Sequence, residues 1–209
     1  MSRRTPAGER SARERMVYSA VQLIRMQGVS GTGRREVVAR AGAPRGSLQH
    51  YFPGGKEQLV GEAVAWAGDF AADQVSRFLQ ALPRRAPSAL FEAMADQWRR
   101  EFDRIGFGRG CPIVATVADV AASDRMREAA RQAFEHWQEP VAGALTDLGV
   151  PAGRAPALAL LMLSALEGAI VLARVRRDNG PLDTVTAELG PLLDSAVPGR
   201  PRQGQRAPS

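Results

Sequence analysis

The sequence predicts an all-α fold of about nine helices, and three observations lead to this prediction. Apolar residues recur at three- and four-residue intervals, and no stretch sustains the apolar and polar alternation of a half-buried strand. The composition is that of a folded chain, with 44% hydrophobic and 24% charged residues among 209. Glycine and proline separate the periodic segments, which places helix ends between them.

A first helix is predicted over residues 11–27. Ser11 and Glu14 have the S-x-x-E spacing of a capping box, in which each side chain accepts a hydrogen bond from the other residue's backbone N–H. Apolar residues then follow at helical spacing from Met16 to Ile24. Gly28 stands where a left-handed residue ends a helix.

Two short helices should follow, separated by a tight turn. Glu36 is placed to cap the second helix, Val37 and Val38 lie on its buried face, and Gly42 ends it. A turn over 42–44 leads to a third helix over 44–51, because proline suits the first helical position. Two short helices around a glycine-containing turn, packed on a longer helix, form a helix-turn-helix.

The rest of the chain predicts a larger helical body. Helices are expected over 56–82, 88–105, 112–121, 123–148 with Pro140 as a kink, 155–177 and 181–197. The segment after Pro198 is rich in Pro, Gly, Gln and Arg and is expected to be disordered. The predicted division is therefore a first domain over 1–55, a second over 56–197 and a disordered basic tail over 198–209.

The positive charge is concentrated in the first domain. The chain carries a net charge of +6, and residues 1–58 hold eleven Arg or Lys against four Asp or Glu. The rest of the chain is close to neutral. This asymmetry suggests a polyanionic partner, such as a nucleic acid, for the N-terminal end.

Several other functional classes are poorly supported. The one cysteine, Cys111, allows neither an intramolecular disulfide nor a cysteine-based zinc site, and the two histidines lack ligand-spaced partners, so no metal or other cofactor is expected. No nucleophile, base and orienting residue can be aligned, so we do not expect an enzyme. The apolar run over 157–173 is interrupted by Glu167, which favours a buried helix over a membrane span. The Arg-rich N-terminus is unlike a secretory signal, so a cytoplasmic protein is expected.

The helix-turn-helix supplies side chains for both base and phosphate contacts. Arg45 at the start of the third helix can pair with a guanine edge, and Gln49 one turn later with an adenine edge. Lys56, the only lysine, is placed to hold a phosphate at the start of the next helix. The predicted DNA-binding residues are Arg34, Arg35, Pro44, Arg45, Ser47, Gln49, His50, Tyr51 and Lys56.

The same residues carry a family resemblance. The run GAPRGSLQHYF at 42–52, followed by PGGKEQL at 53–59 and preceded by EVVARA at 36–41, resembles the signature of TetR-family transcriptional repressors. GCP at 110–112 and ALEGA at 165–169 resemble the LmrA-like branch, whose members regulate efflux and oxidoreductase genes. Two positions differ from the usual pattern: Gln49 replaces a tyrosine, and Gly33 replaces a Ser or Thr cap.

The resemblance implies a homodimer with a DNA-reading head and a ligand-binding body in each subunit. The expected function is that of a ligand-responsive repressor that binds a palindromic operator of double-stranded DNA. A small apolar or aromatic effector would release it. Two alternatives remain: a helical protein-interaction adaptor that does not bind DNA, and an enzyme that depends on Cys111.

The body offers candidate residues for an effector site and a dimer interface. Aromatic side chains gather on three of its helices. The helix over 155–177 is apolar on more than one face, and the last helix carries one apolar stripe beside it. The predicted effector-binding residues are Trp66, Phe70, Met94, Gln97, Trp98, Phe102, Cys111, Phe134, Trp137 and Glu167. The predicted dimer-interface residues are Leu163, Ile170, Arg174, Leu189 and Leu193.

Overall fold

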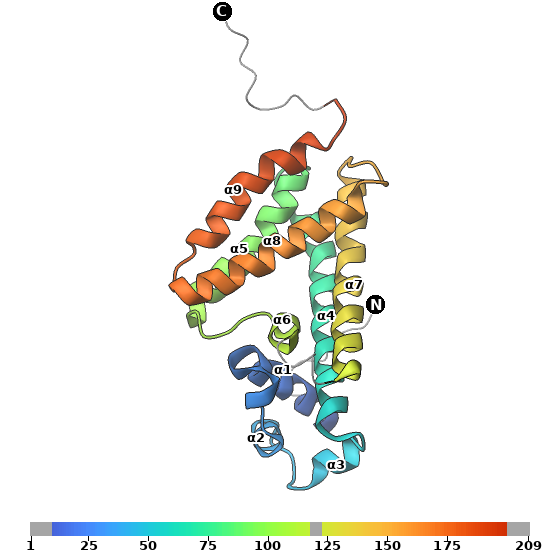
Figure 1. The fold of residues 1–209 in the computed structure, drawn as a ribbon, viewed down its shortest axis with the longest axis vertical. Helices are drawn as coiled ribbons and strands as arrows, with labels where there is room; N and C mark the ends of the chain where they lie inside the picture. The colour runs from blue at the N-terminus through green and yellow to red at the C-terminus, as the bar shows by residue number, and fades with distance from the viewer. Residues whose placement is uncertain (1–9, 118–122, 200–209) are drawn as a thin grey trace, which may run out of the picture. The chain divides into compact units, whose positions relative to one another are not determined.

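The computed structural model describes residues 10–117 and 123–199, and all regular elements within these ranges are helices, as predicted (Figure 1). Nine helices lie in this part of the chain. Two compact units are present: Met1–Phe70 with Gly110–Phe134, hereafter unit 1, and Ala71–Arg109 with Glu135–Ser209, unit 2. Each unit consists of two separate segments of the chain, whereas the sequence predicts two domains that follow one another. The predicted division into residues 1–55 and 56–197 stays a prediction.

The first helix, α1 (Ala12–Gly31), begins at the predicted capping box. The N–H of Ser11 donates to Oε2 of Glu14 at 2.7 Å, and the N–H of Glu14 donates to Oγ of Ser11 at 3.2 Å. These bonds hold the pKa of Glu14 below its ordinary value, because they stabilise the charged carboxylate. Gly28 takes φ +72° and interrupts the helix, so the predicted break is confirmed, and one further turn follows it.

Unit 1 has its own hydrophobic core, to which α6 (Pro112–Val117) contributes. The N–H of Gly110 donates to the carbonyl of Arg25, and Nε of Arg25 donates to the carbonyl of Gly110, both at 2.9 Å. This pair of bonds fixes the start of α6 against α1. The largest fully buried side chains of the unit are Met16, Ile24, Phe52, Leu59 and Ile113.

Two long helices, α4 (Gly55–Ala81) and α7 (Asp124–Asp147), run from one unit into the other. Both match the predicted segments closely. At the start of α7, Oγ of Ser123 accepts a hydrogen bond from the N–H of Met126 at 3.3 Å and caps the helix. Pro140 lies inside α7 without ending it. The predicted continuation of α6 to residue 121 and most of the predicted tail lie outside the described residues.

Unit 2 is built around α5 (Pro87–Ile105), α8 (Ala155–Arg176) and α9 (Gly180–Ser195), with α9 packed against both of the others (Figure 1). The helix α8 is long and apolar enough to span a membrane by length and composition alone. Half of its most apolar window is buried inside the structure, as in a core helix. Its most deeply buried large side chains are Met162, Leu166 and Ile170.

Candidate nucleic-acid interface

The helix α2 (Arg34–Arg40) ends in a tight turn that sets the direction of the next helix. The N–H of Ala43 donates to the carbonyl of Val38, and the N–H of Gly42 donates to the carbonyl of Ala39, each at 3.1 Å. Gly42 takes φ +59°, as the predicted cap requires. These bonds and this angle make a Schellman motif, which satisfies the last carbonyls of α2 and turns the chain sharply.

The start of α2 differs from the prediction in one detail. The Glu36 carboxylate, expected to cap this helix, accepts a hydrogen bond from Nε2 of Gln27 in α1 at 2.8 Å instead. Gly33 stands at the N-cap and makes no side-chain capping bond. The hydrogen bond between Gln27 and Glu36 therefore joins α2 to α1, and Glu36 does not cap α2.

The helix α3 (Ser47–Tyr51) is shorter than predicted. Gly46 takes φ +87°, a left-handed value that no helix interior contains, so the helix begins at Ser47 and not at Pro44. Arg45 therefore lies in the turn before α3, and the prediction that it begins this helix is wrong. Because an arginine side chain is long, its guanidinium can still reach the same surface as the α3 residues.

Buried side chains hold α3 in place on the rest of unit 1. Leu48 is 6% exposed, and Phe52, which follows α3, is fully buried. Arg13 of α1 lies over the Phe52 ring, 5.2 Å from its centroid. Arg15 of α1 donates from Nε to the carbonyl of Ala41 at 2.9 Å, which ties the end of α2 to α1. Arg15 is a positioning residue that the sequence reasoning missed, because nothing in its local pattern shows which distant carbonyl it meets.

A groove of about 810 Å³ runs between α2, the turn and α3. Three of the nine residues that line it are arginines and none is acidic, so its potential is positive. Four predicted DNA-binding residues, Arg34, Arg35, Arg45 and Gln49, lie together on its wall. The remaining lining residues are Val38, Ala39, Ala43, Gly46 and Leu48.

The other predicted contacts have local partners or lie beside the groove. The Ser47 hydroxyl donates a hydrogen bond to the carbonyl of Pro44 at 2.7 Å. This bond would have to break before the hydroxyl could donate to a phosphate. Gln49 donates from Nε2 to the carbonyl of Pro53 at 3.2 Å, and this bond leaves its amide oxygen available as an acceptor. The rings of His50 and Tyr51 lie edge to face, 5.0 Å apart. Lys56 stands in the first turn of α4, as predicted.

The predicted effector-binding residues divide between the two units. Trp66, Phe70, Cys111 and Phe134 belong to unit 1, where the Trp66 and Phe70 rings stack with centroids 5.8 Å apart. The other six are Met94, Gln97, Trp98, Phe102, Trp137 and Glu167, and they belong to unit 2. All of these six except Gln97 are buried. Phe102 contacts both Trp98 and Phe107, with ring centroids 5.7 Å and 4.8 Å apart.

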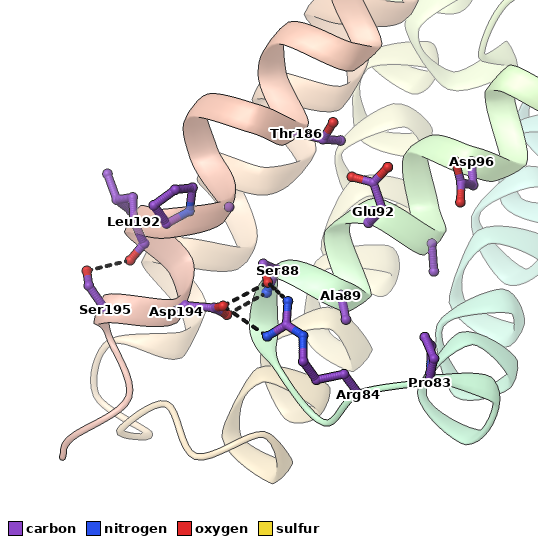
Figure 2. A pocket seen from close by; sticks show the side chains of 13 residues that line it. Pro83, Arg84, Ser88, Ala89, Glu92, Asp96, Thr186, Leu192, Asp194 and Ser195 are labelled. Carbon is purple, nitrogen blue, oxygen red and sulfur yellow. Dashed lines mark hydrogen bonds and ion pairs between the residues drawn. The ribbon is translucent and has the colours of Figure 1, made fainter. Parts of the chain in front are cut away.

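Unit 2 also contains a groove of about 990 Å³ between α5 and α9 (Figure 2). The Asp194 carboxylate accepts bonds from the N–H of Ser88 at 3.0 Å, from Oγ of Ser88 at 2.9 Å and from Nη1 of Arg84 at 3.1 Å. Partial burial alone would raise the pKa of Asp194, but these bonds outweigh it and hold the pKa below its ordinary value. None of the predicted effector-binding residues lines this groove.

Most of the predicted dimer-interface residues lie inside unit 2. Leu163, Ile170 and Leu193 are at most 3% exposed in the single chain. Arg174 donates weakly from Nε to the carbonyl of Phe107 at 3.4 Å, and Leu189 is half-buried. The large apolar side chains that α8 leaves exposed are Leu160, Leu161, Val171, Leu172 and Val175.

Comparisons with known proteins agree with the geometry of unit 1. Residues 18–63 match the model of bacterial regulatory proteins of the tetR family, and residues 87–188 match the C-terminal domain of LmrA/YxaF-like transcriptional regulators. An uncharacterised HTH-type transcriptional regulator of Mycobacterium tuberculosis is 42% identical over 91% of this chain and 98% of its own. LmrA of Bacillus subtilis is 28% identical over 87% and 96%.

A solved structure of a regulatory protein TetR from Rhodobacter sphaeroides shares the fold. It superposes with a TM-score of 0.75 at 25% identity, over 86% of this chain and 97% of its own. The helix-turn-helix, the all-helical fold and both family matches point to one assignment. This chain belongs to the TetR family of bacterial transcriptional regulators, in its LmrA/YxaF-like branch.

Proposed function

We propose that this protein is a ligand-responsive repressor that binds a palindromic operator as a homodimer in the cytoplasm. The observation that carries the proposal is the groove along α2 and α3, where three arginines and Gln49 converge without a carboxylate among the lining residues. A positive surface beside a recognition helix suits a DNA major groove flanked by phosphates. An adaptor for proteins would have no need of this arrangement.

Footprinting on the DNA that flanks its own gene tests operator binding. Because a dimer presents two recognition helices, protection should be two-fold symmetric, with half-sites about one helical turn or a multiple apart. Arg45→Ala should weaken operator binding by about 1 to 3 kcal/mol and relax the preference at one base position. Arg77→Ala removes the same charge from an exposed position in unit 2, outside the groove lining, and serves as the control. Absence of a footprint with the wild type would favour the adaptor.

The exposed apolar face of α8 supports the homodimer. Its exposed large side chains recur at helical spacing, and the small residues Ser164 and Gly168 lie exposed between them. Small residues let two helices approach closely, while the flanking large side chains supply apolar area to bury. We therefore propose that the dimer uses this exposed face of α8. The predicted interface residues Leu163 and Ile170 lie beside it but are buried.

The interior of unit 2 supports an aromatic or apolar effector. Trp98, Phe102 and Phe107 form a continuous aromatic cluster, and the Glu167 carboxyl is buried in the same unit. Aromatic walls with a few polar groups are typical of small-molecule sites. We expect a planar apolar compound, with a cationic group where it meets Glu167, to quench tryptophan fluorescence and lower operator affinity.

Trp98→Ala tests the effector site separately from the DNA head. The variant should bind the operator as the wild type does and fail to release it when the effector is added, because Trp98 belongs to unit 2 and the operator groove to unit 1. Tyr18→Phe, an aromatic change outside the cluster, is the control. Normal release by the Trp98 variant would place the effector elsewhere.

A further inference from the structure

Arg125, at the start of α7, lies over the turn that follows the recognition helix. A Cβ atom at Gly54 would stand 3.4 Å from Nη1 of Arg125. Gly54 lies two residues before Lys56, in the turn between α3 and α4. A guanidinium from a distant part of the sequence therefore lies next to the turn after the recognition helix. Both Gly54 and Arg125 belong to unit 1.

Within unit 1, α4 packs against α7, the helix that carries Arg125 (Figure 1). A Cβ at Gly61 would lie 3.9 Å from Cβ of Ala129, and one at Gly68 would lie 3.1 Å from Cα, Cβ and the carbonyl oxygen of Ala133. Glycine on one helix and alanine on the other let the two backbones approach closely. Because Arg125 stands one helical turn before Ala129, the same seam directs it toward the Gly54 turn.

The Arg125 guanidinium is available to a ligand. Its side chain is exposed and makes no hydrogen bond or ion pair with any other residue in the described ranges. Its neighbours on α7 differ: Arg127 pairs with Asp124 at 2.7 Å, and Arg131 pairs with Glu128 at 2.6 Å. Among the described residues, therefore, no carboxylate pairs with the Arg125 guanidinium.

We propose that Arg125 is a DNA-phosphate contact, which acts beside Lys56 at the turn that follows the recognition helix. The assignment rests on the proposed DNA-binding function and extends the DNA-contacting surface beyond the helix-turn-helix. A guanidinium can donate two parallel hydrogen bonds to one phosphate, and the neighbouring ammonium adds a second positive charge. Such contacts fix the register of the head on the duplex and carry no base information.

The test compares Arg125→Gln with Arg127→Gln, which removes the same charge from the same helix. Binding to the footprinted operator and to a scrambled duplex is measured by fluorescence anisotropy across a range of salt concentrations. Arg125→Gln should weaken binding to both duplexes by the same factor. It should also make the slope of log K against log salt less steep, by about 0.9 for each phosphate that is no longer neutralised. Arg127→Gln should leave the slope unchanged. Arg125→Lys, which keeps the positive charge, should retain most of the wild-type salt dependence.

The outcomes separate this inference from the proposed function. If the wild type binds the operator and both glutamine variants have its affinity and salt slope, the Arg125 assignment is wrong and DNA binding stands. If the wild type binds no duplex even at low salt, the proposed function itself fails. A change in base preference with Arg125→Gln would also overturn the assignment, because a phosphate contact cannot produce it. Circular dichroism checks that the variants fold alike.

Discussion

At the scale of single residues, one backbone angle decides where the recognition helix begins. Gly46 takes φ +87°, and nothing lies within 4 Å of the position that a Cβ would occupy there. Any cost of a side chain at this position therefore comes from the backbone angle and not from a clash. Gly33 is different, because its φ of −84° is open to every residue and it stands at the N-cap of α2.

These two glycines predict opposite effects on stability. Gly46→Ala should lower the free energy of unfolding by about 1 to 2 kcal/mol, because it forces alanine into a left-handed conformation. Gly33→Ser should raise it by a few tenths of a kcal/mol, because the new hydroxyl can accept a bond from an unpaired amide of α2. Urea denaturation followed by circular dichroism measures both. Equal stability of the two variants would contradict the assigned turn geometry.

At the scale of elements, α9 caps the start of α5. Ala86, the N-cap residue of α5, makes no side-chain capping bond, and the Ser88 N–H instead donates to Asp194 of α9 (Figure 2). The carboxylate also lies at the positive end of the α5 dipole. At the other end of the contact, Arg99 of α5 donates to Asp183 and Thr186 of α9, so the two helices are joined at both ends.

Asp194→Asn should lower the stability of unit 2 by about 1 to 2 kcal/mol at neutral pH. The folded-state pKa of Asp194 lies below its ordinary value of 3.8, so its contribution is present above about pH 4 and is lost as the pH falls through the folded pKa. Urea midpoints of wild type and variant should therefore converge below about pH 4. Arg84→Ala, which removes an exposed ion-pair partner, should cost less than about 1 kcal/mol. If the urea midpoints of wild type and Asp194→Asn differ by the same amount at every acidic pH, Asp194 does not cap α5 through its charge.

The seam between α4 and α7 gives a second prediction at this scale. Gly61→Ala should stabilise the protein by up to about 1 kcal/mol, because alanine favours the helix and its Cβ would meet Ala129 at an ordinary 3.9 Å. Gly68→Ala should instead destabilise it, because its Cβ would press on the backbone of Ala133 at 3.1 Å. Thermal unfolding of the two variants checks the signs. A stabilising Gly68→Ala would show that the seam is looser than described.

At the scale of the whole molecule, the exposed face of α8 and the proposed dimer lead to one test. Leu172 is 50% exposed, whereas the neighbouring Ile170 is 1% exposed. Leu172→Asp should give a folded monomer in sedimentation equilibrium, because the charge would be buried only at the partner interface. Ile170→Asp should unfold unit 2, because it places a charge inside the core. A Leu172→Asp variant that remains a dimer would move the interface away from this face.

Local patterns in the sequence were enough to specify the helices, the order of the motifs and the family. Helix ends depend on local signals, so the Ser11 and Glu14 capping box and the breaks at Gly28 and Gly42 could be predicted directly. The glycine and proline between helices likewise located α4, α5, α8 and α9 to within a few residues. Arg34, Arg35, Arg45 and Gln49 could be chosen because they lie on either side of a turn of recognisable composition.

Tertiary packing, in contrast, determines which residues from distant segments meet and which face of each helix is covered. Periodicity shows that α8 is apolar all round, but burial of Ile170 and exposure of Leu172 depend on where α9 packs. The Arg15 bond to Ala41, the Asp194 cap on α5 and the place of Arg125 over Gly54 join positions far apart in the chain. Such contacts depend on packing, which fixes side chains from several helices at once, so no local pattern of residues can specify them.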